Sequence, residues 1–370
     1  MIRTDVCVRG AGVVGRSLAL ALSRQGFSVA LQGADERPRA SEDVRAYALN
    51  AASVALLSEL KVWGALPDDA ATPVYDMHVE GDAPGAAIDF SAWQQSVEAL
   101  AWIVDAAALE DALAAALRFA PHVQLVGEQP VDAALTALCE GRDSAGRAAR
   151  GVRWAVQPYG QRALATRLVA DRPHQGVARQ WFRAPDVLAL LPFDRPQRGA
   201  SYGLVWSLPQ DRAEALLEAD DAAFELALNE ATGGAAGVLR LAGPRAAWPL
   251  AIARAEPVCG PGWVLLGDAA HLVHPLAGQG LNLGLADVAT LTHVIATREP
   301  WRGIGDEKLL RRHARERTLP TWAMGQVTDG LLQLFSQPAP WLRELRNRGL
   351  TLVNGLPPLK RWLATRALGS

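Results

Sequence analysis

Residues 5–32, DVCVRGAGVVGRSLALALSRQGFSVALQ, contain the pattern that decides the fold. An apolar run at 5–9 ends at a glycine-rich turn, a helical pattern covers 16–25, and a second apolar run covers 27–32. This order predicts a β-α-β unit of about thirty residues.

Gly10, Gly12 and Gly15 form the pattern G-x-G-x-x-G between the first strand and the helix. The first glycine permits a tight turn, the second lets the backbone approach a diphosphate, and the third allows the helix to pack closely on the strand. The start of the helix adds free N–H groups and a partial positive charge. We therefore expect a nucleotide cofactor here. The expected cofactor-binding residues of this motif are Gly10, Gly12, Val14 and Gly15.

A second glycine motif lies near the other end of the chain. The run WVLLGDAAH (263–271) continues as LVHPLAGQGLNLG (272–284), with a helix expected from about Leu281 to Ala296. A carboxylate at the end of a strand can accept hydrogen bonds from ribityl hydroxyl groups, and a helix start can stabilise negative charge on a reduced flavin. The cofactor-binding residues expected here are Gly267, Asp268, Pro275, Gly278, Gly280, Leu281 and Asn282. His271 and His274 lack the cysteines or acidic cluster that would complete a metal site, so we expect no metal.

Composition is that of an ordinary globular protein. The chain has 370 residues and a formal net charge of -2, so we expect no nucleic-acid partner. Its three cysteines are far apart in the sequence and indicate neither a zinc site nor a disulfide framework. We expect no signal peptide, and no apolar run reaches the roughly 18 residues that a membrane span requires. The sequence therefore predicts a cytoplasmic protein, in contact with a membrane at most peripherally.

The elements predict an α/β fold with two interleaved domains. A Rossmann-like nucleotide-binding domain, which a family resemblance of the two glycine motifs implies binds FAD, is expected at residues 1–72, 97–160 and 255–300. A mixed β-sheet domain, which the same resemblance implies is the substrate domain, is expected at 73–96 and 161–254, and a helical segment at 301–370. One long helix is expected at Ile103–Phe119, and strands at Arg162–Val169, Gly176–Phe182, Val187–Pro192 and Ser201–Ser207.

The two motifs together resemble the FAD-dependent hydroxylases of ubiquinone biosynthesis, a branch of the para-hydroxybenzoate-hydroxylase-like flavoprotein monooxygenases. The resemblance continues through DVRAYALN (43–50), where it implies that Arg45 lies near the flavin, and through GVARQWF (176–182) and LPPLKR (356–361). It covers essentially the whole chain. It also implies that Trp181, Trp206 and Trp248 lie near the substrate.

The chain departs from the family pattern at two places. The second strand ends in Gln32-Gly33, where the family has an acidic residue that binds the adenosine ribose. The helix after Ile103 carries Ala106, Ala107 and Glu110 at positions where the family has Asn-Arg and then Gln. Losing one charged hydrogen bond costs about 1.5–3 kcal/mol. These departures predict weaker retention of FAD.

The resemblance implies a monooxygenase that hydroxylates an aromatic ring, such as a polyprenylated phenol or quinol, with FAD, O2 and NAD(P)H as a transient reductant. Arg45 and His274 are candidates for tuning the flavin environment. The basic amphipathic stretch 341–366 is a candidate for peripheral membrane contact, and a quinone-biosynthesis complex is a candidate partner. Two alternatives remain open: a redox-inactive scaffold of the same fold in such a complex, and a flavin dehydrogenase or reductase that does not use oxygen.

Overall fold

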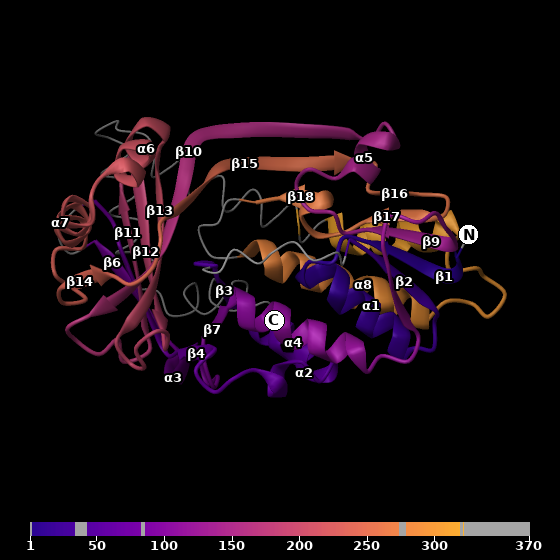
Figure 1. Cartoon of the computed structure of the whole chain (residues 1–370), viewed down its shortest axis with the longest axis horizontal. Helices are drawn as coiled ribbons and strands as arrows, with labels where there is room; N and C mark the ends of the chain where they lie inside the picture. Colours follow the sequence, from indigo (N-terminus) through magenta and orange to yellow (C-terminus); the bar gives the residue numbers. More distant parts are fainter. Residues whose placement is uncertain (1, 34–42, 83–85, 274–278, 319–320, 322–370) are drawn as a thin grey trace.

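The computed structural model describes residues 2–33, 43–82, 86–273, 279–318 and 321. They form two halves joined by a pair of long antiparallel strands, β10 (Arg153–Ala170) and β15 (Ala246–Glu256). These two strands run along the top of the molecule in Figure 1, from the large sheet on the left to the N-terminal half on the right.

The N-terminal half is built on a six-stranded sheet with the order β16-β17-β9-β1-β2-β8, in which every neighbouring pair except β16 with β17 is parallel. Its strands are β1 (Ile2–Arg9), β2 (Val29–Gln32), β8 (Val123–Val126), β9 (Val131–Leu138), β16 (Cys259–Gly260) and β17 (Trp263–Leu265). The central strand β1 is an unbroken apolar run over Val6, Cys7 and Val8, which are all buried. A parallel strand covered on both faces requires such a run.

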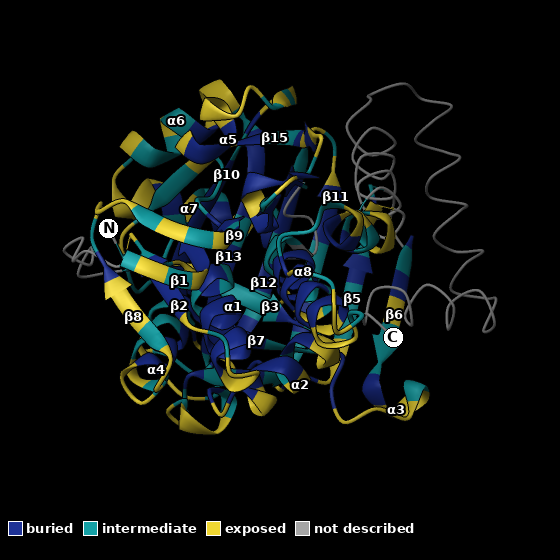
Figure 2. Ribbon diagram, turned by 90° about the vertical axis from the view of Figure 1, so that its right-hand side faces the viewer, coloured by how far each residue is buried: buried dark blue, intermediate teal, exposed yellow. Residues whose placement is uncertain are grey.

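Two helices of this half pack on α1 (Val13–Arg24). Helix α1 contacts both α4 (Ala106–Arg118) and α8 (Gln279–Ala296). The inner sides of α1 and α8 are buried (Figure 2) and belong to one hydrophobic core with the sheet. The confirmed β-α-β unit therefore brings the turn at Gly10–Gly15 next to the start of α8, although more than 260 residues separate them in the sequence.

The second half is a larger sheet with the order β18-β15-β10-β13-β12-β11-β5-β6, and β14 also pairs with β10. Its other strands are β5 (Asp76–Glu80), β6 (Ala87–Ser91), β11 (Val177–Arg183), β12 (Asp186–Phe193), β13 (Ser201–Pro209), β14 (Leu239–Leu241) and β18 (His271–Leu272). Helices α6 (Gln210–Glu218) and α7 (Asp221–Thr232) cover its outer face. This arrangement confirms the predicted α/β fold class with an added mixed sheet.

Strand β10 is longer than the sequence predicted, because it begins at Arg153 rather than near Arg162. Its pairing with β15 shifts register between Pro158 and Arg162, and Gly160 has a φ of +65°. Such an irregularity bends a strand and increases its twist. β10 can therefore belong to both halves, and the division into domains near residue 160 stays a prediction.

The prediction of one helix over Ile103–Phe119 was wrong at its start. Residues Ala101–Asp105 form β7, the middle strand of a small sheet with β3 (Ala46–Leu49) and β4 (Ala71–Val74). The helix α4 begins only after Asp105, whose carboxylate accepts the N–H of Ala108 at 2.8 Å. An aspartate with extended backbone is a favoured N-cap, and β-branched Ile103 and Val104 favour the strand before it. Helix α2 (Ala51–Glu59) follows β3.

The third glycine of the first motif provides a test of this packing. A Cβ at Gly15 would lie 1.9 Å from the carbonyl oxygen of Gly10, whereas a Cβ at Gly12 would meet no atom within 4 Å. Gly15→Ala should therefore lower the free energy of unfolding by about 1–3 kcal/mol in urea titrations without added FAD. The matched Gly12→Ala should change it by less than about 0.5 kcal/mol. Equal losses in both variants would contradict this packing.

Candidate active site

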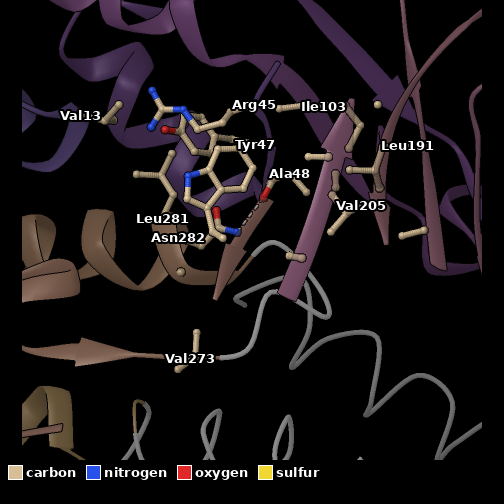
Figure 3. A pocket seen from close by; sticks show the side chains of 18 of the residues that line it. Val13, Arg45, Tyr47, Ala48, Ile103, Leu191, Val205, Val273, Leu281 and Asn282 are labelled. Carbon is tan, nitrogen blue, oxygen red and sulfur yellow. Dashed lines mark hydrogen bonds between the residues drawn. The ribbon is translucent and has the colours of Figure 1, made fainter. Parts of the chain in front are cut away.

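A cavity of about 680 Å³ lies between the two halves. Figure 3 shows it from close by, with Arg45 and Tyr47 toward one end and Leu191 and Val205 toward the other. The first end is formed by the glycine turn, by the segment around Asp268 and by the start of α8. The other end is formed by the inner face of the large sheet.

The glycine turn leaves its backbone open to the cavity. Gly10 has a φ of +102°, and a Cβ there would lie 2.2 Å from the carbonyl oxygen of Cys139. Gly12 is the N-cap of α1 and lines the cavity, while Gly10 and Gly15 lie behind it. The first turn of α1 has no acidic side chain and no side-chain cap, so its N–H groups lack a side-chain acceptor, and Gly12, Val13 and Val14 line this end of the cavity. The turn can therefore accept an anionic group.

The second motif brings a carboxylate to the same end. Gly267–Ala269 form a single 3₁₀ turn after β17, and Asp268 lines the cavity. The Asp268 side chain is exposed to the cavity, which is itself enclosed by protein on several sides. Burial raises the pKa of Asp268, although His271 and Arg142 favour its charged form.

Val14 fixes the distance between the two motifs. A Cβ at Gly284 would lie 2.7 Å from Val14, and one at Gly267 would lie 3.3 Å from it. Val14 also lines the cavity. The branched side chain on α1 is therefore matched by two glycines of the second motif, which allows α1 and α8 to approach closely.

Helix α8 begins at Gln279, two residues earlier than the sequence predicted, so Gly280, Leu281 and Asn282 form its first turn and line the cavity. The Asn282 amide donates to the carbonyl oxygen of Ala48 at 2.8 Å (Figure 3). Its oxygen accepts from the Asn50 N–H at 3.0 Å and from the Ser53 hydroxyl at 2.7 Å. These contacts fix α8 to β3 and α2, so Asn282 positions the helix start.

Arg45 lines the cavity, but two carboxylates hold its guanidinium. Its Nη2 lies 2.6 Å from Asp43 Oδ2 and 3.2 Å from Glu110 Oε1, and its Nε donates to both oxygens of Asp43. The hydrogen bonds with Asp43 raise the pKa of Arg45. The segment around Arg45 is held from the other half by Arg167, which donates to the Arg45 carbonyl oxygen at 2.6 Å.

A buried charge network supports the Asp268 segment from behind. Asp287 on α8 accepts the N–H of Gly267 at 2.9 Å, His271 Nε2 lies 2.8 Å from the same carboxylate, and Arg317 Nε donates to it at 2.6 Å. Burial alone would raise the pKa of Asp287, but the neighbouring His271 and Arg317 hold it well below its usual range. Arg317 belongs to the helix at 307–318. Three segments of the chain therefore meet at one carboxylate.

The sheet end of the cavity has a face of small apolar side chains. Because residues opposite each other in antiparallel strands share a face, the register aligns one side of four strands toward the cavity. The cavity-facing positions are Ala163, Ala165, Ala178, Ala189, Gly203 and Val205. Gln180 is a polar residue on this face. This end can accept an apolar group.

Of the three tryptophans expected near the substrate, Trp248 lines the cavity. The expectation was wrong for Trp181 and Trp206. Both are buried on the opposite face of the sheet against the helices. The two-residue period of a strand decided this, because their neighbours Gln180 and Val205 point the other way.

Some residues that line the cavity were not predicted from the sequence. Tyr47 and Arg142 line the cavity, and burial raises the pKa of Tyr47 to about 12, so its hydroxyl stays protonated. Tyr47 lies two residues after Arg45, at the start of β3, and this two-residue spacing is the signal that could have found it. The predicted residues His274, Pro275 and Gly278 lie outside the described residues. Within the described ranges, no group of three or more His, Cys, Asp or Glu side chains could hold a metal ion.

These features fit an FAD molecule. Gly12 brings side-chain-free backbone to the cavity, the start of α1 offers N–H groups for a diphosphate, and Asp268 offers a carboxylate for hydroxyl groups. The cavity continues past them into an apolar space for a further ring. The fit is that of a bound dinucleotide with a second, apolar ligand beside it.

Comparisons with known proteins agree. The FAD binding domain family matches residues 111–328. The chain is 30% identical to 3-demethoxyubiquinol 3-hydroxylase of Escherichia coli K12, over 99% of this chain and 98% of that protein. It is 29% identical to ubiquinone hydroxylase UbiL of Rhodospirillum rubrum, over 99% and 90%.

Solved structures share the fold at low sequence identity. The p-nitrophenol 4-monooxygenase PnpA of Pseudomonas putida superimposes with a TM-score of 0.78 at 17% identity, covering 100% of this chain and 99% of that one. PqsL, described as a probable FAD-dependent monooxygenase of Pseudomonas aeruginosa, gives 0.75 at 18%, covering 94% and 99%. Fold and site together define an FAD-dependent flavoprotein monooxygenase. Within that class, the chain belongs to the family of FAD-dependent hydroxylases of ubiquinone biosynthesis.

The histidine next to the Asp287 network provides a pH test. His313 is 2% exposed, and burial lowers its pKa to about 4. Because its pKa in the unfolded chain is about 6.5, the folded state favours the neutral ring, and stability falls as the pH falls from about 6.5 toward 4. Between about pH 6.5 and about pH 5, urea unfolding should show a loss of about 2 kcal/mol from this residue.

His313→Phe should remove that part of the pH dependence. The exposed His293 is the matched control, and His293→Phe should leave the dependence as in the wild type. An unchanged slope in His313→Phe would show that the ring titrates normally in the folded protein.

Proposed function

We propose that the protein hydroxylates the ring of a phenol or quinol that carries a polyprenyl chain, using O2 and NAD(P)H. The observation that carries the proposal is the cavity, which combines a dinucleotide end with an apolar end of small side chains. The names of the relatives, 3-demethoxyubiquinol 3-hydroxylase and ubiquinone hydroxylase, support the same class of substrate.

Each end of the cavity has a separate task. FAD, when bound, supplies the redox chemistry that activates O2. Gly12 and the start of α1 would hold its diphosphate, Asp268 its ribityl hydroxyl groups, and Gly280 and Leu281 at the start of α8 the ring edge that becomes negative on reduction. Gly267, Val14 and Asn282 position these groups, and His274, Pro275 and Gly278 remain predicted contacts.

The sheet end would orient the substrate ring and exclude water. Its side chains offer no nucleophile, and hydroxylation of this kind needs none. Gln180 is a candidate for a hydrogen bond to a ring oxygen. NAD(P)H would approach transiently, since the sequence has no second dinucleotide motif.

A polyprenylated substrate partitions into lipid, so we also propose cytoplasmic action at a membrane surface, within a quinone-biosynthesis complex. None of the helices in the described ranges is long and apolar enough to span a membrane. The basic stretch 341–366, the predicted contact, lies outside those ranges. Flotation with anionic lipid vesicles tests the contact, and a protein that stays in the aqueous fraction would contradict it.

The function is tested first by flavin binding and then by turnover. The purified protein should bind FAD with the visible spectrum of an oxidised flavin, and Asp268→Ala should weaken binding tenfold to a hundredfold, about 1.5–3 kcal/mol. The control Asp211→Ala removes an exposed carboxylate on α6 and should leave FAD binding unchanged. NAD(P)H oxidation with O2 uptake and a hydroxylated product should follow when a prenylated phenol or quinol is added. No flavin binding would favour the scaffold, and NAD(P)H oxidation without O2 uptake would favour the reductase.

The apolar end is tested by filling it. Val205→Phe places a larger side chain on the cavity face of β13, so the KM for a prenylated substrate should rise at least about tenfold, the change produced by about 1.4 kcal/mol. FAD affinity should stay unchanged. Val238→Phe adds the same volume at an exposed position and should alter neither. An unchanged KM in Val205→Phe would mean that the substrate lies elsewhere.

A further inference from the structure

We propose that Glu110 opposes the diphosphate of FAD and, with Asp43, keeps the Arg45 guanidinium from pairing with it, so that the cofactor binds reversibly and exchanges with the solution. This inference rests on the proposed function, in that FAD is taken as the ligand of the glycine turn. Glu110 stands at a position where the chain departs from the family pattern.

Arg45 is the cation of a three-residue charge cluster at this end of the cavity, which Arg142 also lines. Arg45 provides one positive charge, and two carboxylates share it, with Nη2 at 2.6 Å from Asp43 Oδ2 and 3.2 Å from Glu110 Oε1. Both carboxylate oxygens of Asp43 also accept a hydrogen bond from Arg45 Nε. In addition, Asp43 Oδ1 accepts the Arg45 backbone N–H at 3.0 Å. A bidentate contact of this kind is among the stronger ion pairs. The cluster of Asp43, Arg45 and Glu110 therefore carries a net charge of about -1.

Glu110 is fixed beside the glycine turn. Its main-chain carbonyl oxygen accepts a hydrogen bond from Arg16 Nη1, in the first turns of α1, at 2.7 Å. Helices α1 and α4 pack on each other, so the Glu110 side chain cannot move far from the start of α1. Glu110, Arg45 and Gly12 all line the cavity. The carboxylate is thus held near the place where a diphosphate would bind.

The rest of α4 does not offset this charge. Between Ala106 and Leu117 its ionisable residues are Glu110 and Asp111, and the first basic residue is Arg118 at its far end. The first turn has alanines at 106 and 107 and so adds no charge. Two like charges facing each other destabilise a complex by an amount that dissolved salt reduces.

The test measures affinity for two flavins by the quenching of flavin fluorescence. Riboflavin is the control ligand, because it has the ring and the ribityl chain of FAD but no phosphate. Glu110→Gln keeps the size of the side chain and should lower the Kd for FAD about tenfold at low salt while leaving that for riboflavin unchanged. Asp111→Asn removes the neighbouring, exposed carboxylate and should change neither Kd by more than about twofold.

Salt gives a second measurement that needs no variant. Added NaCl should tighten FAD binding to the wild type, because it screens the repulsion, and should not tighten binding to Glu110→Gln. The opposite result, in which salt weakens wild-type binding as much as it weakens the variant, would overturn the proposal.

The outcomes separate this inference from the proposed function. If the wild type binds FAD but Glu110→Gln binds it no better, or gains equally for riboflavin, the role of Glu110 is wrong and the function stands. If neither form binds FAD or riboflavin at high concentration, both the function and this inference fail.

Discussion

The guanidinium of Arg167 is the point on which the arrangement of the two halves depends. It belongs to the large sheet, is 7% exposed, and donates to the carbonyl oxygen of Arg45 at 2.6 Å and to Asp105 at 3.2 Å. It also lies 4.0 Å from the ring centre of Phe193. Burial lowers the pKa of Arg167 to about 10, while Asp105 favours its charged form. A cation so placed fixes β3 and the start of α4 against the sheet, since an unpaired buried charge is strongly destabilising. The cavity lies between the two halves that the contacts of Arg167 hold together.

At the cofactor end, a buried anion rather than a buried cation holds several segments of the chain together. The carboxylate of Asp287 joins the Gly267 turn, His271 and the helix at 307–318. It does not line the large cavity, but it supports the turn that presents Asp268. Buried ions that bind several segments at once give a site its rigidity, which a loop with only backbone contacts lacks. The cofactor end of the cavity is therefore preformed. The affinity for the cofactor is set by the groups that line the cavity and not by Asp287.

Glycine and alanine have different purposes at the two ends. At the cofactor end, Gly15, Gly267 and Gly284 remove atoms that would collide with the backbone of Gly10 or with Val14. At the sheet end, alanines and Gly203 remove volume and so create space. A Cβ at Gly203 would lie 3.4 Å from Ala46, so this glycine also lets β3 approach the sheet. Small residues thus give close packing at one end and an open cavity at the other.

The sequence by itself determined the fold class, the family and the two glycine motifs, because these depend on short-range spacing: a turn between strand and helix needs glycine wherever it occurs. It also revealed that Glu110 and Gly33 depart from the family pattern. Only the tertiary structure decided which side chains meet. The start of α4 moved to Ala106 because β7 pairs with β3 and β4, and Trp181 and Trp206 turned away because strand pairing sets which face each residue occupies. The pairing of Arg45 with Glu110 spans 65 residues. Contacts of this kind follow from the packing of whole elements, and no local pattern in the chain encodes them.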